Sequence, residues 1–258
     1  MKLLSLFLLA ALPLFAGTEI KYPAGDVTAH GYLALPEGAS AEKPVPGVIV
    51  IHEWWGHNDY ARSRADKLAA LGYAALAIDM YGEGKNADHP KDAGGFAREA
   101  TSKVEVMKTR FLAGMKTLQE RPEVDSKQIA SIGYCMGGMI SLQMAALEVP
   151  NLEGAASFHG ALNVKFPNDT PLKAKLLVCN GAEDTFIPES AINSFKEQVT
   201  EHKGDLTFIN HPDAVHGFSN PDATALGKKN GINIAYNEAA DKASWTALQD
   251  FLKELFVK

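Results

Sequence analysis

A cysteine set between glycines is the residue in this sequence best suited to chemistry. The segment Gly133-Tyr134-Cys135-Met136-Gly137 follows an apolar run and has the form G-x-S-x-G, with cysteine in the serine position. This form is typical of a sharp strand-to-helix turn, in which glycine accepts the cramped backbone and the central side chain is exposed at the sheet edge. We therefore predict that Cys135 is a nucleophile.

A nucleophilic thiol needs a base, because only a few per cent of a free cysteine is thiolate at neutral pH. At such a turn the acid and the histidine follow the nucleophile along the chain, each on a loop after a later strand. Asp184 follows the apolar run that ends at Cys179, and His216 follows the run that ends at Ile209. We predict that His216 takes the thiol proton and that Asp184 orients the imidazole. Taken alone, each residue also fits an ordinary loop position.

Two backbone N–H groups are expected to stabilise the negative charge that develops on a substrate oxygen. One belongs to Met136, the residue after the nucleophile. The other is expected from the loop after the apolar run 45–51, at Trp54. Because both are main-chain groups, side-chain substitution tests them poorly.

The loop that follows residue 51 has an unusual composition, HEWWGH, over residues 52–57. We interpret Glu53 as pointing at Cys135, where a carboxylate disfavours a second negative charge and keeps the resting thiol protonated. The two indoles would line an apolar pocket. The alternative is that the indoles pack over the core and Glu53 is a solvated carboxylate. No metal site is expected, because the spacing of His52 and His57 differs from H-E-x-x-H on a helix.

The elements that must position these residues alternate between apolar runs and amphipathic segments. This pattern predicts an α/β fold with a mostly parallel sheet covered by helices on both faces. An antiparallel hairpin is expected before residue 45. The expected strands span 45–51, 73–78, 129–134, 155–158, 176–179 and 206–209. The expected helices span 59–71 (with Asp59 as its cap and Gly72 as its stop), 96–119, 137–148, 189–202 and 238–256.

The first residues are typical of an export signal. Lys2 precedes an apolar stretch from Leu3 to Leu14, and Ala16 and Gly17 are small enough for cleavage. The stretch is shorter than the roughly 20 apolar residues that span a bilayer. We therefore expect a signal peptide over 1–17, a single domain over 18–258, and a secreted or periplasmic protein without a stable membrane anchor. A buried N-terminal helix or an uncleaved anchor is the alternative.

The net charge bears on the partners of the protein, and the cysteine content bears on its disulfides. The formal net charge is −6 and no basic stripe is present, so nucleic acid is not an expected partner. The second cysteine, Cys179, lies in an apolar run and is expected to be a small buried residue. A disulfide between Cys135 and Cys179 is the alternative in an oxidising compartment.

Taken together, these motifs resemble the dienelactone hydrolase family of α/β-hydrolases. The resemblance covers nearly all of the chain after the signal, and it implies a Cys135–His216–Asp184 triad with Glu53 paired to the resting thiol until substrate binds. It also implies hydrolysis of small-molecule esters or lactones through an acyl-enzyme, with no cofactor. The matching segments are GYCMGG (133–138), HEWWG (52–56), DMYG (79–82), 181–188 and HGF (216–218).

The chain departs from this family where a carboxylated lactone would bind. The family's namesake activity uses two arginines, at positions where this chain has the pairs Gly82–Glu83 and Ser219–Asn220. An acidic residue where a carboxylate should dock is repulsive. We therefore predict weak hydrolysis of dienelactone beside faster hydrolysis of neutral esters.

Aromatic side chains near the expected site indicate an apolar acyl or alcohol group. We predict that Trp55, Tyr81 and Phe218 bind substrate, together with Trp54. A thioesterase or acyl-transfer enzyme with the same triad is one alternative function. A non-catalytic binding protein on the same scaffold is another.

Overall fold

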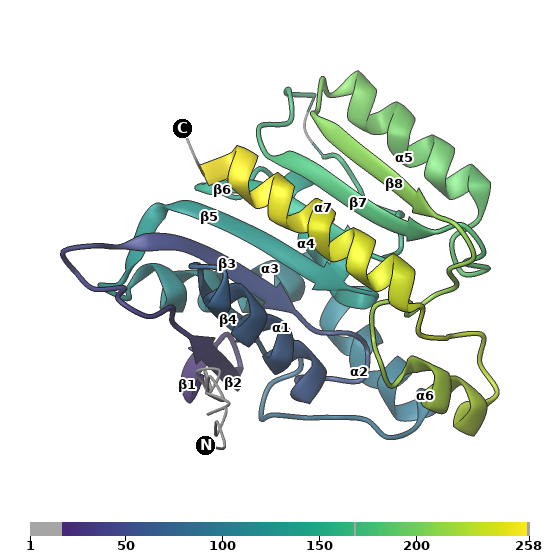
Figure 1. Ribbon diagram of the computed structural model, residues 1–258, viewed down its shortest axis with the longest axis horizontal. Helices are drawn as coiled ribbons and strands as arrows, with labels where there is room; N and C mark the ends of the chain where they lie inside the picture. Colours follow the sequence, from purple (N-terminus) through teal and green to yellow (C-terminus); the bar gives the residue numbers. More distant parts are fainter. Residues whose placement is uncertain (1–16, 168, 257–258) are drawn as a thin grey trace, which may run out of the picture.

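The sheet forms because successive apolar runs pair side by side. The computed structural model describes residues 17–167 and 169–256, and within these it has eight strands in the order β1-β2-β4-β3-β5-β6-β7-β8. The pairs β1–β2 and β2–β4 are antiparallel, and all other pairs are parallel (Figure 1). The strands are β1 (Thr18–Ala24), β2 (Val27–Ala34), β3 (Val45–Ile51), β4 (Ala74–Ile78), β5 (Val124–Tyr134), β6 (Leu152–Phe158), β7 (Lys175–Gly181) and β8 (Leu206–His211).

Helices cover both faces of this sheet. The helices are α1 (Asp59–Ala70), α2 (Pro90–Thr101), α3 (Val104–Gln119), α4 (Met136–Ala146), α5 (Glu189–Glu201), α6 (Ala223–Asn230) and α7 (Glu238–Phe256). In Figure 1, α1 and α7 cross the near face, and α3 and α4 lie behind the sheet. Two apolar cores result, one on each face, so the central strands are buried on both sides. This is the expected α/β architecture, and the prediction of the fold class is confirmed.

Two local predictions are wrong. The helix expected over 96–119 is two helices, because Lys103 adopts an extended backbone (φ −119°, ψ 120°) between α2 and α3. The cap of α1 is Asn58, whose side-chain oxygen accepts the N–H of Ala61 at 3.4 Å, whereas Asp59 is the first helical residue.

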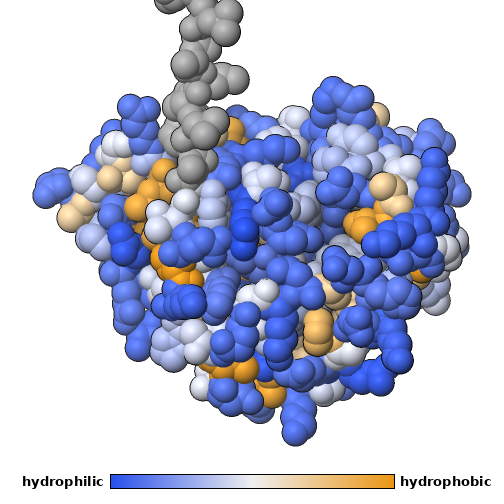
Figure 2. All heavy atoms as spheres, turned by 90° about the horizontal axis from the view of Figure 1, so that it is seen from below, coloured by the Kyte–Doolittle hydropathy of each residue, from blue (hydrophilic) through white to orange (hydrophobic). Residues whose placement is uncertain are grey.

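The molecular surface is mostly polar. Figure 2 shows one face that is largely hydrophilic, with small separate apolar patches. Among the described residues, the large hydrophobic side chains classed as exposed are Leu71 and Phe186. The expected signal segment lies outside the described residues apart from Gly17. The helices that the structure describes include none with the length and apolar character needed to cross a membrane.

Candidate active site

The elbow at Cys135 is built by close backbone packing. Cys135 has φ 53° and ψ −116°, a conformation that few residues other than glycine adopt. A Cβ atom on Gly133 would lie 1.9 Å from the carbonyl oxygen of Gly137, and one on Gly137 would lie 2.3 Å from the carbonyl oxygen of Ile51. Strand β5 can therefore turn into α4 only with glycine at both positions. The backbone N–H of Cys135 donates to the carbonyl oxygen of Phe158 at 3.0 Å, which holds the turn against β6.

The predicted base and acid lie together beside this turn. His216 Nδ1 is 2.8 Å from Asp184 Oδ2, and the Asp184 side chain is buried. The other carboxylate oxygen of Asp184 accepts the backbone N–H of Phe186 at 2.9 Å, which fixes the carboxylate in its loop. Asp184 follows β7 and His216 follows β8, so parallel strand ends bring both residues to the edge that carries Cys135.

The protonation of His216 responds to the thiol. Burial opposes protonation of the ring, but the charge of Cys135 and hydrogen bonds with Asp184 and Cys135 outweigh burial and raise the pKa of His216 above its usual range. In general, an imidazole whose pKa is raised beside a thiol and a carboxylate is able to accept the thiol proton.

Glu53 has a different partner from the one expected. Its carboxylate accepts a hydrogen bond from Asn220 Nδ2 at 2.6 Å, whereas the expected partner was the thiol of Cys135. Burial raises the pKa of Glu53 to about 7, although the bond from Asn220 and the charges of His216 and Arg64 oppose the rise. Glu53 therefore titrates near neutral pH while it lines the same cavity as Cys135. Asn220 is a site residue that the sequence interpretation treated only as a missing arginine.

The loop that carries the second expected N–H donor is held from behind. Tyr81 Oη donates to the carbonyl oxygen of Trp54 at 2.9 Å, and Gly56 N–H donates to the carbonyl oxygen of Glu53 at 3.2 Å. Met136 is the first residue of α4, so its backbone N–H has no acceptor within the helix. Trp54 and Met136 both line the cavity at Cys135, and their role as donors to a substrate oxygen stays a prediction.

An apolar cavity of about 340 Å³ opens onto Cys135. Its polar lining side chains are those of Glu53, Cys135, Asn163 and His216, and among the described residues no lysine or arginine lines it. Phe186 stands at the opening with 53% of its surface exposed, and its ring lies 5.0 Å from that of His216. The apolar lining residues are Trp54, Trp55, Ala97, Met136, Met139, Ala161, Phe186, Ile187, Ile232 and Ile234.

Two of the predicted substrate contacts need correction. Phe218 is fully buried, because Gly217 (φ 75°) turns the chain and Phe218 packs against His159 and His211. Tyr81 is also buried and does not line the cavity; it supports Trp54 instead. Trp55 does line the cavity. Phe186, which the sequence interpretation did not select, is the aromatic ring at the opening.

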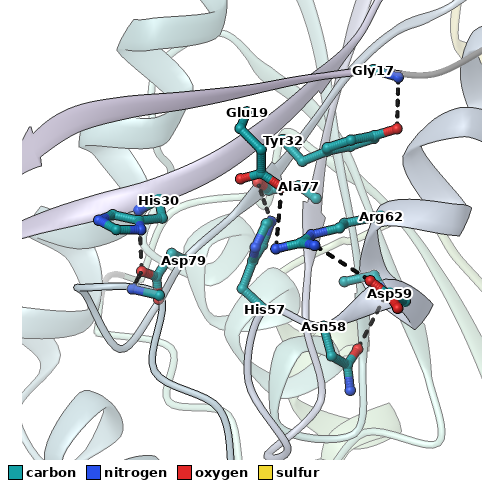
Figure 3. A network of polar contacts seen from close by, with 12 residues as sticks. Gly17, Glu19, His30, Tyr32, His57, Asn58, Asp59, Arg62, Ala77 and Asp79 are labelled. Atoms are coloured by element: carbon teal, nitrogen blue, oxygen red, sulfur yellow. Dashed lines mark hydrogen bonds and ion pairs between the residues drawn. The ribbon is translucent and has the colours of Figure 1, made fainter.

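The two histidines of the loop after β3 are engaged in structural hydrogen bonds. His52 Nδ1 donates to the carbonyl oxygen of Glu53 at 2.5 Å, and His52 Nε2 accepts the N–H of Met80 at 3.1 Å. His57 Nε2 donates to the carbonyl oxygen of Ala77 at 3.0 Å, beside the ion pairs of Arg62 (Figure 3). Within 17–167 and 169–256, no cluster of three or more His, Cys, Asp or Glu side chains has the arrangement of a metal site. Cys179 is buried in β7, and neither cysteine forms a disulfide.

Several known proteins are similar to this chain in sequence, in fold or in both. The model of the dienelactone hydrolase family matches residues 29–256. A dienelactone hydrolase-like promiscuous phosphotriesterase from metagenomic libraries superposes with a TM-score of 0.86 at 31% identity, covering 93% of this chain and 98% of that one. A dienelactone hydrolase from Anabaena variabilis has a TM-score of 0.65 at 18% identity, covering 93% and 99%, and so supports the fold alone. Protein usf of Aquifex pyrophilus is 25% identical over 242 residues, which is 92% of this chain and 98% of that protein.

These similarities agree with the geometry of the site. The sheet is that of the α/β-hydrolases, and the family match includes the elbow and the loops after β3, β7 and β8. The resemblance predicted from the residue patterns is thereby confirmed. The chain belongs to the dienelactone hydrolase family and is a hydrolase.

Proposed function

We propose that this protein is an exported hydrolase that cleaves neutral carboxylic esters or lactones through an acyl-Cys135 intermediate. The observation that carries the proposal is the pairing of Asp184 with His216 at 2.8 Å, next to Cys135, whose thiolate form raises the pKa of that histidine. Nucleophile, base and orienting acid then stand in the order that acyl transfer requires.

The reaction has two halves. His216 takes the proton of the Cys135 thiol as the sulfur attacks the carbonyl carbon, and the oxygen that becomes negative accepts hydrogen bonds from the N–H groups of Met136 and Trp54. When this intermediate collapses, the C–O bond to the alcohol breaks and His216 gives its proton to the departing oxygen. His216 then takes a proton from water, the hydroxide attacks the thioester carbon, the C–S bond breaks to release the acid, and the proton on His216 returns to the sulfur to restore the thiol.

The cavity favours an uncharged substrate. In the part of the chain that the structure describes, no lysine or arginine lines it, so a carboxylate on the substrate would find no cation there to pair with. At the positions where the family's arginines would stand, the Glu83 carboxylate accepts the N–H of Thr28 and Asn220 binds Glu53. Dienelactone is therefore expected to be a poor substrate.

A substrate panel on the purified protein tests this proposal. Neutral esters, neutral lactones, dienelactone and thioesters are compared at equal concentration, and acyl-Cys135 is sought by mass spectrometry of rapidly quenched samples. Neutral esters should be hydrolysed fastest, with the acyl group on the peptide that contains Cys135. Faster turnover of dienelactone would refute the neutral-substrate assignment, and faster turnover of thioesters would favour the thioesterase alternative.

A second candidate activity is the hydrolysis of neutral phosphotriesters. The related protein with 31% identity is a promiscuous phosphotriesterase, and an apolar cavity without cations suits an uncharged triester. In this reaction the thiolate forms an S–P bond as the alcohol or phenol leaves, and water then cleaves that bond. Phosphorus on Cys135 after incubation with an aryl dialkyl phosphate would support the activity, and unmodified Cys135 without released phenol would reject it.

Export is the remaining part of the proposal. The expected signal peptide over residues 1–17 supports it. Expression of the full chain in a Gram-negative host, followed by fractionation and N-terminal sequencing, provides the test. A periplasmic protein that begins near residue 17 is expected, and an intact cytoplasmic chain would contradict export.

A further inference from the structure

Two consecutive residues at the end of β6 contact both the nucleophile and the base. The carbonyl oxygen of Phe158 accepts the N–H of Cys135 at 3.0 Å. The ring of His159 packs edge-on against the ring of His216, with centroids 5.1 Å apart and planes at 63°. Two adjacent residues, Phe158 and His159, therefore contact the backbone of Cys135 and the imidazole of His216.

His159 is also bonded to the loop that carries His216. Its Nε2 lies 2.8 Å from Ser219 Oγ, which in turn lies 2.7 Å from Tyr60 Oη. The carbonyl oxygen of Ser219 accepts a hydrogen bond from Arg64 Nη2. The side chains of all four residues are buried, so the loop after β8 is fastened from behind on both its side-chain and main-chain groups.

Histidine at position 159 is costly for the fold. The residue is fully buried with φ 42°, and its Nδ1 has no hydrogen-bond partner. A buried polar atom without a partner and a left-handed backbone both destabilise the folded state. A phenylalanine at the same place would avoid the unpartnered nitrogen. What histidine adds is the hydrogen bond to Ser219.

Burial, aided by nearby charges, keeps the ring of His159 neutral. Burial, followed by the charges of His216 and Arg64, holds the pKa of His159 well below its usual range. Tyr134 is the other ionisable ring beside it, with centroids 6.2 Å apart. A neutral ring can lie against a protonated His216 without repelling it.

We propose that the Phe158–His159 step sets the separation between Cys135 and His216, with His159 as a positioning residue that acts through the His216 ring and through Ser219. The proposal rests on the proposed function, because it concerns the same nucleophile and base. It assigns His159 no proton transfer and no contact with substrate.

Three variants separate the two contacts of His159. His159→Leu removes both, His159→Gln keeps a group that can bond Ser219 but removes the ring, and Ser219→Ala keeps the ring but removes the bond. For His159→Leu we expect kcat to fall about 10- to 100-fold, since small misplacement of reacting groups costs this much. KM should stay near the wild-type value, and the pH dependence of kcat/KM should shift as His216 loses its place beside Cys135. His159→Gln and Ser219→Ala should each lose part of this rate.

His57→Leu is the matched control. His57 is also buried, with one ring nitrogen bonded to a carbonyl oxygen and the other without a partner, but the bonded carbonyl belongs to Ala77 on β4. This variant should lower the melting temperature and leave kcat and the pH profile unchanged.

The outcomes are decisive in either direction. A folded His159→Leu with wild-type kcat and pH profile would overturn the proposal, as would an equal loss of kcat in His57→Leu. If His159→Leu does not fold, Ser219→Ala decides by the same two readouts. Inactivity of the wild-type enzyme on every ester, lactone and thioester would instead refute the proposed function.

Discussion

Two hollows lie at opposite ends of the parallel strands, and they differ more in the residues that line them than in volume. The cavity at the carboxyl ends, of about 340 Å³, contains Cys135, His216 and Glu53. The hollow at the amino ends of β6 and β7 is larger, at about 490 Å³, and its charged lining residues are Glu148, Glu153, Lys173 and Lys175.

The difference between the hollows is in how their polar groups are held. Lys175 makes ion pairs with Glu254 and Asp205, all three in contact with solvent, where such pairs contribute little. In the smaller cavity Glu53 is 5% exposed and carries a pKa of about 7. Burial and convergence of loops after several strands, rather than volume, therefore mark the reactive end of the sheet.

The largest expected effect removes the nucleophile. Cys135→Ala should reduce kcat/KM by on the order of 10⁴-fold, because the sulfur that forms the covalent bond is lost. Lys173→Ala, in the larger hollow, should stay within about twofold of wild type. Initial rates on a neutral aryl ester measure both, and comparable losses would erase the distinction between the hollows.

The next effect removes the charge that orients His216. Asp184→Asn should lower kcat by about 10²- to 10⁴-fold, since the amide stabilises the imidazolium poorly. KM should change little because Asp184 does not line the cavity. Steady-state kinetics give both constants, and a loss confined to KM would assign Asp184 to binding.

Titration of Glu53 should make the stability of the folded protein depend on pH in a defined direction. Its pKa is raised by burial from 4.5 to about 7, so the folded state holds this proton more tightly than the unfolded state. The stability this confers is complete below pH 4.5 and is lost as pH rises through about 7. Glu53→Gln keeps an acceptor for Asn220 but does not titrate. Relative to wild type, the free energy of unfolding of this variant should be higher by on the order of 3 kcal/mol at about pH 8.

Denaturant unfolding at several pH values measures this gain. The two proteins should have nearly equal pH dependence below pH 4.5, which serves as the internal control. A difference between them that stays constant from acid to alkaline pH would mean that Glu53 titrates in the folded protein as it does in the unfolded chain.

The smallest effect concerns the opening of the cavity. Phe186→Ala should raise KM for aryl esters by roughly 2- to 10-fold, the value of an aromatic contact, and leave alkyl esters nearly unchanged. Leu71→Ala is the control, because Leu71 is also an exposed large hydrophobic residue but does not line the cavity. An equal effect on aryl and alkyl esters would show that Phe186 does not select an aromatic group.

Much of this arrangement was predictable because it follows chain order. Cys135, Asp184 and His216 each follow an apolar strand, and parallel strands bring such positions to one edge whatever the loops do. The glycines at 133 and 137 carry the signal for the elbow in their spacing alone.

The rest depends on contacts that spacing does not encode. Gly217 turns the chain so that Phe218 faces the core, although Phe218 lies only two residues after His216 in the sequence. Proximity in sequence to His216 therefore predicts the wrong environment for this ring. Asn220 meets Glu53 across 167 positions of the chain, a pairing that only the folded backbone creates. The break between helices at Lys103 also has no signal in the sequence, because apolar residues continue at helical spacing on both sides of it.

The packing of Gly137 on the carbonyl oxygen of Ile51 has a consequence for redesign of the enzyme. The elbow tolerates no side chain at positions 133 and 137, whereas Cys135, which lies between them, is half-buried and lines the cavity. Under the proposed mechanism, a serine at position 135 would face the same base and acid, so Cys135→Ser tests whether this site also supports oxygen chemistry. Mutant libraries should therefore vary position 135 and the cavity wall, and leave the two glycines untouched.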